Sequence, residues 1–403
     1  MRGPRPDLRV LIYSHDSFGL GHLRRCRAIA HALVERNRNL SVLILTGSPI
    51  VGSFDFRARV DFVRVPGVIK LRNGEYTSLS LHIDIENTIA LRESIIQHTA
   101  DTFDPDIFIV DKEPLGLRGE VTGTLEMLKA RGTPLVLGLR DVMDEPAALA
   151  PEWARKNVVP ALRDLYDQIW VYGLPEICDP IEDIALPRDV RRKVIYTGYL
   201  KRNVPKALKT KGAKPPFDEP YLLVTAGGGG DGEEMIDWVL RAYEHDRAAP
   251  HPALIVFGPF MRPESQAAFT ARADRLERVR AITFDARIET LMAKAAGIVG
   301  MGGYNTFCEI LSFDKPAIIV PRTKPRLEQH IRASRAEELG MVRMLAANGP
   351  RNAKTMANAL RALPDQSRPS QVVMPGLLDG LGNVDRLAGQ LIGTDTARSK
   401  VAV

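Results

Sequence analysis

The first strand–loop–helix unit, LRVLIYSHDSFGLGHLRRCRAIAHALVER (residues 8–36), sets the pattern for the whole chain. Its opening residues are apolar on both faces and predict a buried parallel strand over 8–14. Two glycines follow in the loop, and apolar residues at helical spacing then predict a helix over 22–36. A strand that runs through a glycine-containing loop into a helix begins a β–α–β crossover, so we expect a parallel sheet.

The same alternation of short apolar runs and helical patterns recurs through two stretches of the chain. Strands are predicted at 8–14, 40–46, 61–67, 106–111, 134–139, 168–173 and 194–199, and then at 221–227, 253–258, 280–284, 297–301, 317–321 and 342–345. Helices are predicted at 22–36, 82–102, 119–131, 151–165, 231–245, 263–277, 287–296, 304–313, 327–339 and 352–363, with a last helix within 376–392. The predicted fold class is α/β, with two Rossmann-like, doubly wound parallel-sheet domains that face a cleft.

The alternation lapses between the two stretches. Residues 201–220 are rich in lysine and proline and have no sustained apolar face, which is typical of an interdomain linker. We therefore predict an N-terminal domain over 1–200, a C-terminal domain over 221–375, and a C-terminal helix and tail over 376–403. The linker is the expected hinge for domain closure.

The composition narrows the function classes. The 403 residues carry a net charge of +6, which weakly favours anionic partners, while an aromatic content of 6% argues against binding of single-stranded nucleic acid. Three scattered cysteines, Cys26, Cys178 and Cys308, make neither a disulfide framework nor a zinc site and fit a reducing cytosol. We expect no metal, no cofactor and no nucleic-acid partner.

The distribution of apolar residues bears on location. No stretch has the length of a membrane span, and the N-terminal residues lack an apolar core of signal-peptide length. We therefore expect a cytoplasmic protein. Because the net charge is positive, a peripheral contact with anionic lipid at the inner face of the plasma membrane stays open.

The junction between the first strand and its helix raises an electrostatic question. Arg24 and Arg25 lie in the first turn of the predicted helix, where the helix dipole is already positive. Gly19 and Gly21 allow a tight turn beside them, so backbone amides and arginines together predict an anion site. We hypothesise that the two arginines bind an acidic acceptor.

Further candidates stand at the carboxyl ends of the first-domain strands, where doubly wound sheets bind ligands. His22 is the first candidate for a general base, and capping of the helix start is its structural alternative. Asp111 and Glu113, at the end of the fourth predicted strand, are further base candidates. Arg140, at the end of the next strand, contacts either the acceptor or a buried carboxylate.

The second domain has two glycine-rich junctions, and the first is VTAGGGGDGEEM (224–235). Gly227, Gly228 and Gly229 separate a strand from a helix, so backbone amides can approach a phosphate closely. The segment has neither the Gly-Lys-Ser/Thr of a Walker loop nor the spacing of a dinucleotide fingerprint. It predicts a phosphate-binding loop of another kind.

The second junction lies in GMGGYNTFCEILSFDKPAIIVPR (300–322). Gly302 and Gly303 precede a helix on which Thr306 and Glu309, three residues apart, share a face. A carboxylate one turn into a helix above a glycine turn is well placed to accept the hydroxyls of a ribose. A solvated glutamate is the structural alternative.

The longer segment GMGGYNTFCEILSFDKPAIIVPRTKPRLEQHIRASRAEELG (300–340) resembles the C-terminal signature of glycosyltransferase family 28, which includes the N-acetylglucosaminyltransferase of peptidoglycan synthesis. FGLGH (18–22) resembles the glycine–histidine loop of that family, and TAGGGG (225–230) resembles its central glycine loop. The resemblance implies the GT-B fold and a UDP-sugar donor bound mainly by the second domain.

The resemblance also implies, by position, which residues bind the donor. These are Glu309 for the ribose hydroxyls, Gly302, Gly303 and Thr306 for the diphosphate, Gln329 for the sugar, and the loop around Asp285 and Ile288 for the uracil through backbone groups.

The sequence departs from the family pattern at three places. Gly302 replaces the usual serine, and Arg332 stands where asparagine is common. GLGHLRRCRAIA (19–30) is closer to the GxGHxxRCxxLA motif of UDP-sugar hydrolases of nonulosonic-acid synthesis, whose histidine is thought to activate water. As a whole, with IVDKEPLGLRGE (109–120) and LGLRDVMDEP (137–146), the pattern is most similar to bacterial glycosyltransferases of unassigned substrate.

We therefore expect a glycosyltransferase that moves a hexose or N-acetylhexosamine from a UDP-sugar to a glycan or lipid-linked acceptor, such as a cell-envelope polysaccharide precursor. The expected reaction is an inverting, metal-independent displacement, in which His22 or Asp111 removes the acceptor proton. Two alternatives stay open: hydrolysis of the UDP-sugar, with His22 activating water, and nucleotide-sugar binding without catalysis. The residues expected to bind the acceptor are Gly19, Gly21, Arg24, Arg25 and Arg140.

Overall fold

The computed structural model describes residues 7–16, 20–71, 75–204, 217–228, 230–346 and 351–393. The chain divides into two compact units, one of residues 1–200 with 376–403 and one of residues 201–375. The candidates Gly19 and Gly229 lie outside the described residues.

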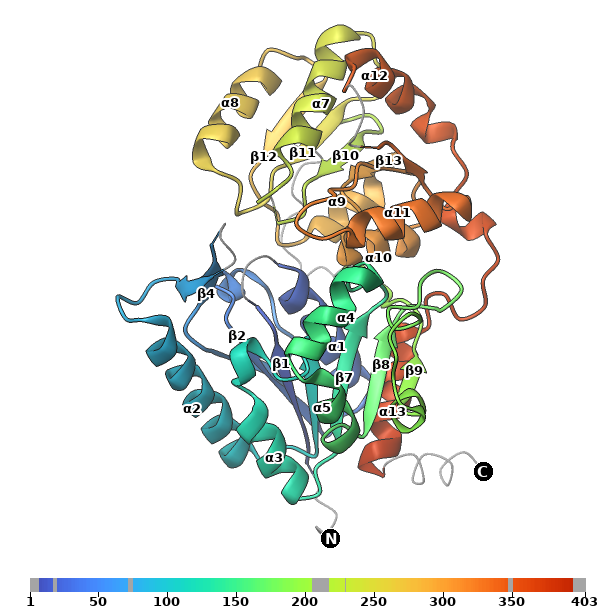
Figure 1. The fold of residues 1–403 in the computed structure, drawn as a ribbon. Coiled ribbons are helices and arrows are strands. Elements are labelled where there is room, and N and C mark those ends of the chain that lie inside the picture. The colour runs from blue at the N-terminus through green and yellow to red at the C-terminus, as the bar shows by residue number, and fades with distance from the viewer. Residues whose placement is uncertain are drawn as a thin grey trace. The chain divides into compact units, whose positions relative to one another are not determined.

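Unit 1 is built on a parallel sheet that, in its described part, has seven strands in the order β3-β2-β1-β6-β7-β8-β9. These strands are β1 (Leu8–Ser14), β2 (Leu40–Thr46), β3 (Val60–Arg64), β6 (Ile107–Asp111), β7 (Leu135–Arg140), β8 (Gln168–Tyr172) and β9 (Val194–Tyr196). Strands β1 and β2 pair in register from Leu8↔Leu40 to Ser14↔Thr46. All pairs in the sheet are parallel because helices connect successive strands, as the alternating pattern predicts (Figure 1).

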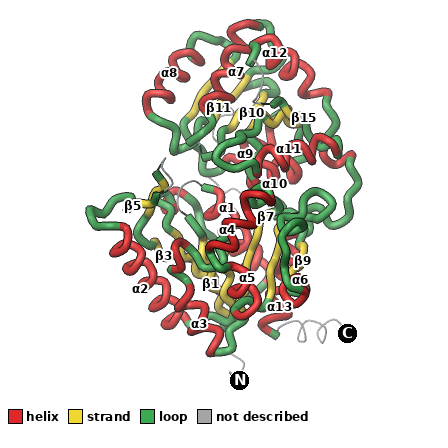
Figure 2. The backbone as a smooth tube through the Cα atoms, viewed as in Figure 1, coloured by secondary structure: helices red, strands yellow, loops and turns green. Residues whose placement is uncertain are grey.

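Helices cover both faces of this sheet (Figure 2). They are α1 (Gly21–Arg36), α2 (Ile85–Phe103), α3 (Thr122–Ala130), α4 (Pro146–Arg155), α5 (Val158–Asp164), α6 (Arg188–Arg191) and α13 (Gly380–Ile392), with 3-10 turns η1 (Val51–Ser53) and η2 (Leu117–Gly119). One core joins alternate strand residues such as Leu11, Phe108 and Leu137 to α2, α3, α4 and α5. Side chains that alternate along a strand point to opposite faces, so Val10 and Ile12 are buried on the other face.

The C-terminal helix α13 returns to unit 1 and packs beside α1. Asn37, just after α1, donates from Nδ2 to Asp385 Oδ1 at 2.7 Å, and Arg36 Nη1 lies 3.8 Å from Asp385 Oδ2. The polypeptide therefore leaves unit 1 after β9, forms unit 2, and returns to unit 1, where α13 lies beside α1.

The structure corrects two details of the predicted elements in unit 1. The helix predicted over 151–165 is two helices, α4 and α5, because Asn157 between them adopts a left-handed backbone with φ +51°. A short antiparallel hairpin of β4 (Val68–Lys70) and β5 (Tyr76–Ser78) was not predicted, since strands of three residues carry too little periodicity to detect.

Unit 2 repeats the architecture. Its described part contains a six-stranded parallel sheet in the order β12-β11-β10-β13-β14-β15, formed by β10 (Leu222–Thr225), β11 (Ala253–Val256), β12 (Val279–Ile282), β13 (Gly297–Gly300), β14 (Ala317–Ile319) and β15 (Arg343–Met344). Its helices are α7 (Glu233–His245), α8 (Pro263–Ala273), α9 (Ile288–Lys294), α10 (Tyr304–Ser312), α11 (Glu328–Glu338) and α12 (Ala353–Ala362), with 3-10 turns η3 (Leu363–Asp365) and η4 (Pro369–Gln371). The prediction of doubly wound parallel sheets is confirmed in both units.

The predicted linker 201–220 begins with residues that belong to unit 2. Arg202 donates from its backbone N to Ser312 Oγ and from Nη2 to Asn305 Oδ1, each at 2.8 Å, so this part of the chain lies against α10. Residues 205–216 of the predicted linker lie outside the described residues. Among the helices that the structure describes, none is both long enough and apolar enough to cross a membrane.

The close packing of unit 1 predicts a cost for one added methyl group. A Cβ at Gly138 in β7 would lie 2.7 Å from Cζ of Tyr172, whose side chain is completely buried. We expect Gly138→Ala to lower the free energy of unfolding by about 1–3 kcal/mol in urea unfolding followed by tryptophan fluorescence. Gly52→Ala is the control, because a Cβ there meets no atom within 4 Å. An equal effect of both substitutions would contradict the prediction.

Candidate functional site

The first candidate site lies where the strand order of the unit 1 sheet reverses. Strands β1 and β6 are neighbours, with Val10 paired to Ile107, although some ninety residues of chain separate them. The loops that leave two such strands diverge to opposite faces and leave a crevice at the carboxyl edge, where doubly wound folds bind ligands. His22 at the start of α1 and Asp111 at the end of β6 meet at this edge.

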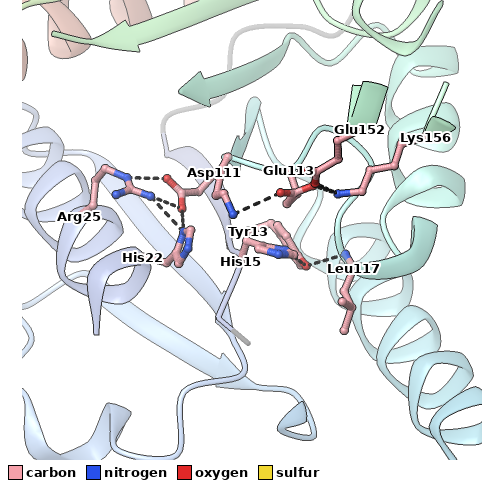
Figure 3. Close-up of polar contacts among 10 residues, drawn as sticks. Tyr13, His15, His22, Arg25, Asp111, Glu113, Leu117, Glu152 and Lys156 are labelled. Atoms are coloured by element: carbon pink, nitrogen blue, oxygen red, sulfur yellow. Dashed lines mark hydrogen bonds and ion pairs between the residues drawn. The ribbon is translucent and has the colours of Figure 1, made fainter. Parts of the chain in front are cut away.

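Three side chains form a compact cluster there (Figure 3). Arg25 donates from Nε to Asp111 Oδ1 and from Nη2 to Asp111 Oδ2, both at 2.7 Å. His22 Nδ1 lies 2.5 Å from Asp111 Oδ2. Arg25 and Asp111 are buried, whereas the His22 side chain is 17% exposed. The bidentate Arg25–Asp111 pair therefore lies beneath the surface and holds a histidine that solvent can reach.

The electrostatics of the cluster decide its protonation. Burial opposes the charged form of Asp111, but the positive charge of Arg25 and the contact with His22 outweigh it and hold the pKa of Asp111 well below its usual range. Burial also lowers the pKa of His22 to about 4, although Asp111 acts in the opposite direction. At neutral pH the cluster is thus an arginine–carboxylate pair beside a neutral imidazole.

The hydrogen bonds assign the tautomer of that imidazole. His22 Nδ1 lies 2.5 Å from Asp111 Oδ2 and 3.0 Å from Arg25 Nη2, which is a donor. An ionised carboxylate only accepts hydrogen bonds, so the shorter contact, with Asp111, favours the tautomer with the proton on Nδ1. The lone pair is then on Nε2, the ring nitrogen turned away from Asp111. A neutral histidine oriented by a carboxylate in this way can accept a proton from a hydroxyl or from water.

Asp16 performs the capping role that the sequence allowed for His22. Its Oδ1 accepts from the backbone N of Leu23 in the first turn of α1 at 3.2 Å, and its Oδ2 accepts from Thr46 Oγ1 at 2.5 Å. Burial raises the pKa of Asp16 to about 6. Asp16 therefore accepts a hydrogen bond from a backbone N–H in the first turn of α1, and the side chain of His22 interacts with Asp111 instead of capping the helix.

A second histidine lies beside the first. The rings of His15 and His22 meet edge to face with centroids 5.7 Å apart, and His15 Nδ1 lies 3.3 Å from the hydroxyl of Tyr13. Tyr13 in turn donates to Glu120, which is paired with Arg92 through Nε at 2.5 Å. Through His15, this buried network is in contact with the ring of His22.

A row of charged side chains continues from Asp111 along the carboxyl edge (Figure 3). Lys112 has a left-handed backbone with φ +70°, and its Nζ lies 3.3 Å from Glu113 Oε1. Glu113 also accepts from Lys156 Nζ at 2.9 Å. Burial opposes the charged form of Glu113, but Lys112, His15 and Lys156 together outweigh it and hold the pKa of Glu113 well below its usual range. An ion-paired carboxylate of low pKa is a poor general base, which leaves His22 as the stronger candidate.

The structure separates the two arginines that the sequence treated alike. Arg25 is buried and bonded to Asp111, so the negative group that its position required is supplied within the protein. Arg24 is half-buried on α1, Gly21 is exposed at the first position of that helix, and Arg140 is half-buried at the end of β7. These three residues remain candidates for contact with an acceptor.

In unit 2, the loops after β10, β13 and β14 meet at the carboxyl edge, again where the strand order reverses. Gly302 (φ +76°) and Gly303 form the turn into α10, and Gln329 Nε2 lies 4.0 Å from the position of a Cβ on Gly303. Gln329 Oε1 accepts from the backbone N of Arg322 at 3.1 Å. Arg322 also donates to Asp231 in the glycine-rich loop, so one side chain joins the loops after β10 and β14.

The remaining donor candidates differ in accessibility. Gly227 is exposed with φ +65°, and Gly228 is half-buried against Gly258. Thr306 is 8% exposed, whereas Glu309 on the same helix is fully buried. The structure therefore brings Gly302, Gly303, Thr306 and Gln329 together and places Glu309 behind them.

Asp285 and Ile288 lie after the edge strand β12, which β11 and β10 separate from β13. Asp285 Oδ1 accepts from the backbone N of Arg287 at 2.7 Å, and Ile288 is buried at the first position of α9. The structure therefore places these two residues at the far side of the same carboxyl edge.

Comparison with protein families identifies this arrangement. Residues 227–369 match the model of the glycosyltransferase family 28 C-terminal domain. The chain is a glycosyltransferase whose second unit contains a domain similar to the family 28 C-terminal domain. The matched residues include the glycine-rich loop, the turn at Gly302 and Gly303, and Gln329, so the family signature coincides with the candidate site of unit 2.

The similarity of this glycosyltransferase to its relatives covers nearly all of the chain. A protein of Methanosarcina acetivorans, described as an uncharacterized glycosyltransferase, is 23% identical over 402 residues, with 94% of each chain covered. Solved structures share the GT-B fold: Phytolacca americana UGT2 complexed with UDP-2fluoro-glucose and pterostilbene (16% identity, TM-score 0.61, 98% and 99% of the two chains) and Acinetobacter baumannii MurG (11%, 0.55, 95% and 99%). The predicted GT-B fold class is thus confirmed.

Several residues of the two sites could not be assigned to a site from the sequence of this transferase. Arg322, which ties Asp231 to Glu328, is one arginine among many in a polar segment. Arg332, fully buried on α11, was noted only as a departure from the family pattern. The pairing of Arg25 with Asp111 joins residues 86 positions apart, and no local pattern can indicate such a contact.

The cluster geometry predicts how the pKa of His22 responds to Arg25. The positive charge of Arg25 lowers the pKa of His22, so Arg25→Met should raise it above the value of about 4. NMR titration of labelled histidines measures this, with the His22 signal assigned by its absence in His22→Gln. Arg27→Met is the matched control on α1, because Arg27 lowers the pKa of His31 and should shift that signal instead. A wild-type His22 that titrates near 6.5 would contradict the arrangement.

Proposed function

We propose that the enzyme transfers a hexose or N-acetylhexosamine from a UDP-sugar to a hydroxyl of a glycan or lipid-linked acceptor, with inversion at the anomeric carbon. The observation that carries this proposal is the neutral His22, oriented by Asp111 and Arg25 at the ligand-binding edge of unit 1. The family 28 C-terminal domain of unit 2 supports a nucleotide-sugar donor. A peripheral contact with a membrane surface would suit a lipid-linked acceptor.

The proposed reaction begins with the acceptor hydroxyl at His22. Nε2 takes the hydroxyl proton while the oxygen attacks the anomeric carbon, and Asp111 stabilises the imidazolium that forms. The bond between the anomeric carbon and the diphosphate oxygen breaks, and its electron pair leaves with UDP. Arg25 keeps Asp111 ionised throughout, since its guanidinium donates to both carboxylate oxygens. Half-buried Arg24 and Arg140 are the proposed contacts for an acidic acceptor.

The departing UDP carries negative charge, which unit 2 is proposed to stabilise through backbone amides. The turn at Gly302 and Gly303 leads into α10, whose first N–H groups point along a positive helix end. We propose that Gly228 contributes a further amide, Thr306 a hydroxyl and Gln329 a contact to the sugar. The amide of Gly227 already donates to Thr225 Oγ1 at 3.2 Å. Among the described residues, no group of three His, Cys, Asp or Glu side chains could hold a metal ion, and we propose that amides perform the role of a metal here.

Phytolacca americana UGT2 and Medicago truncatula UGT71G1, whose solved complexes contain UDP-2fluoro-glucose and UDP-glucose, support the choice of a UDP-sugar. UDP-glucose and UDP-N-acetylglucosamine are therefore the first donors to test. In the assay, UDP release that depends on an acceptor pool from a cell extract supports transfer. Rapid release of free sugar without any acceptor would favour the hydrolase instead.

Removing the proposed base should affect catalysis and leave donor binding intact. We expect His22→Gln to lower kcat by roughly 10²–10⁴-fold, while the Kd of UDP measured by calorimetry stays unchanged. In the wild-type enzyme, kcat/KM should fall as the pH drops through about 4, because a protonated His22 cannot accept a proton. Unaltered kcat in His22→Gln would exclude this residue as the base.

The turn at Gly302 and Gly303 can be tested with a substitution that the structure accommodates. Gly303 has φ −59°, and a Cβ on it would meet no atom closer than 4.0 Å, so alanine fits without strain. The added methyl group would stand at the amide that we propose for the diphosphate, and we expect Gly303→Ala to weaken UDP binding about tenfold with an unchanged Tm. Gly52→Ala in unit 1, which also meets open space, is the control. Full UDP affinity in Gly303→Ala would remove this turn from the donor site.

A further inference from the structure

Arg332 on α11 is a charged residue in the interior of unit 2. Its side chain is fully buried and is among the largest fully buried side chains of the described chain. Ala333 and Ala336 on the same helix are buried beside it. A guanidinium is costly to bury unless strong hydrogen bonds compensate for its lost hydration, so its position requires a specific contact.

That contact is with the turn that precedes α10. Arg332 Nη1 donates to the carbonyl oxygen of Gly302 at 2.9 Å. The guanidinium carbon also lies 5.9 Å from the ring centroid of Tyr304, the first residue of α10. Arg332 therefore meets two residues within three positions of the chain, on either side of Gly303.

The contact determines which way one peptide group faces. In a planar trans peptide the C=O and the following N–H point in opposite directions. Because the carbonyl of Gly302 points at buried Arg332, the N–H of Gly303 points away from it. Gln329 Nε2, 4.0 Å from a Cβ on Gly303, lies beside the same turn.

The same peptide group lies between two glycines, which is the arrangement most prone to rotation of the peptide plane. Gly302 has φ +76°, and a Cβ there would lie 2.7 Å from Cγ2 of Ile319, so no larger residue can replace it. A rotated peptide would present a carbonyl oxygen, and hence partial negative charge, where the amide N–H now stands. Some other group must therefore hold the plane in one orientation.

We propose that Arg332 is a positioning residue that holds the Gly302–Gly303 peptide with its N–H toward the donor diphosphate. The inference deepens the proposed function and rests on it, because it assigns to Arg332 the orientation of one amide of the proposed donor site. Arg332 acts through the backbone and does not itself touch the donor.

The test compares UDP with uridine, since only UDP has the diphosphate that the oriented amide would contact. In calorimetry on the full chain, we expect Arg332→Met to weaken UDP binding about tenfold and to leave uridine binding unchanged. Arg332→Lys retains a donor for the Gly302 carbonyl but lacks the planar guanidinium that fixes its direction, so its UDP affinity should lie between that of the wild type and that of Arg332→Met. Arg335→Met is the matched control, because Arg335 lies on the same helix in an exposed pair with Glu338.

The outcomes separate this inference from the proposed function. An equal loss of UDP and uridine affinity in Arg332→Met, or no loss of either, would overturn the positioning role. If Arg332→Met does not fold, the comparison of Arg332→Lys with Arg335→Met decides: a loss confined to UDP in the lysine variant supports the role, and identical affinities contradict it. A wild-type chain that binds neither UDP nor uridine would instead contradict the proposed donor.

Discussion

The bidentate pair of Arg25 and Asp111 is the interaction on which the site of unit 1 depends. Removal of either partner would leave an unpaired charge beneath the carboxyl edge of the sheet, which is among the most costly changes that a protein interior can undergo. The pair keeps Asp111 ionised, and an ionised Asp111 selects the tautomer of His22. A buried ion pair of this kind adds little net stability, but here it fixes the orientation of the His22 ring at the sheet edge.

Both units have the same reversal of strand order, but different kinds of groups lie beside it. In each sheet the strand order reverses between two neighbouring parallel strands, β1 with β6 in unit 1 and β10 with β13 in unit 2. The reversal leaves the carboxyl edge open to ligands. Unit 1 places titratable side chains at this edge, whereas unit 2 places glycine turns and backbone amides there. Such a division of labour suits a transferase, which must remove a proton from one substrate and stabilise a leaving group on the other.

In both sites a buried arginine supports a group that is itself only partly exposed or buried. Arg25 supports a side chain, through Asp111, and Arg332 supports a backbone turn, through the carbonyl of Gly302. Arginine suits this task because its planar guanidinium stays charged when buried and presents several donors in fixed directions. The cost of burying each guanidinium is offset by hydrogen bonds that also order the group in front of it.

The sequence by itself determined most of the helices and strands of this protein and the glycine turns that follow several of the strands. Apolar periodicity located β1 and β2 to the residue, and glycines after strands marked the turns at Gly227 and Gly302, because these signals depend on residues close together in the chain. Only the tertiary structure decided which partners meet. The strand order brings Asp111 to Arg25 and His22, and the packing of α11 brings Arg332 to Gly302. Contacts between distant residues follow from how elements assemble, and local periodicity records which face of an element is buried but not what it is buried against.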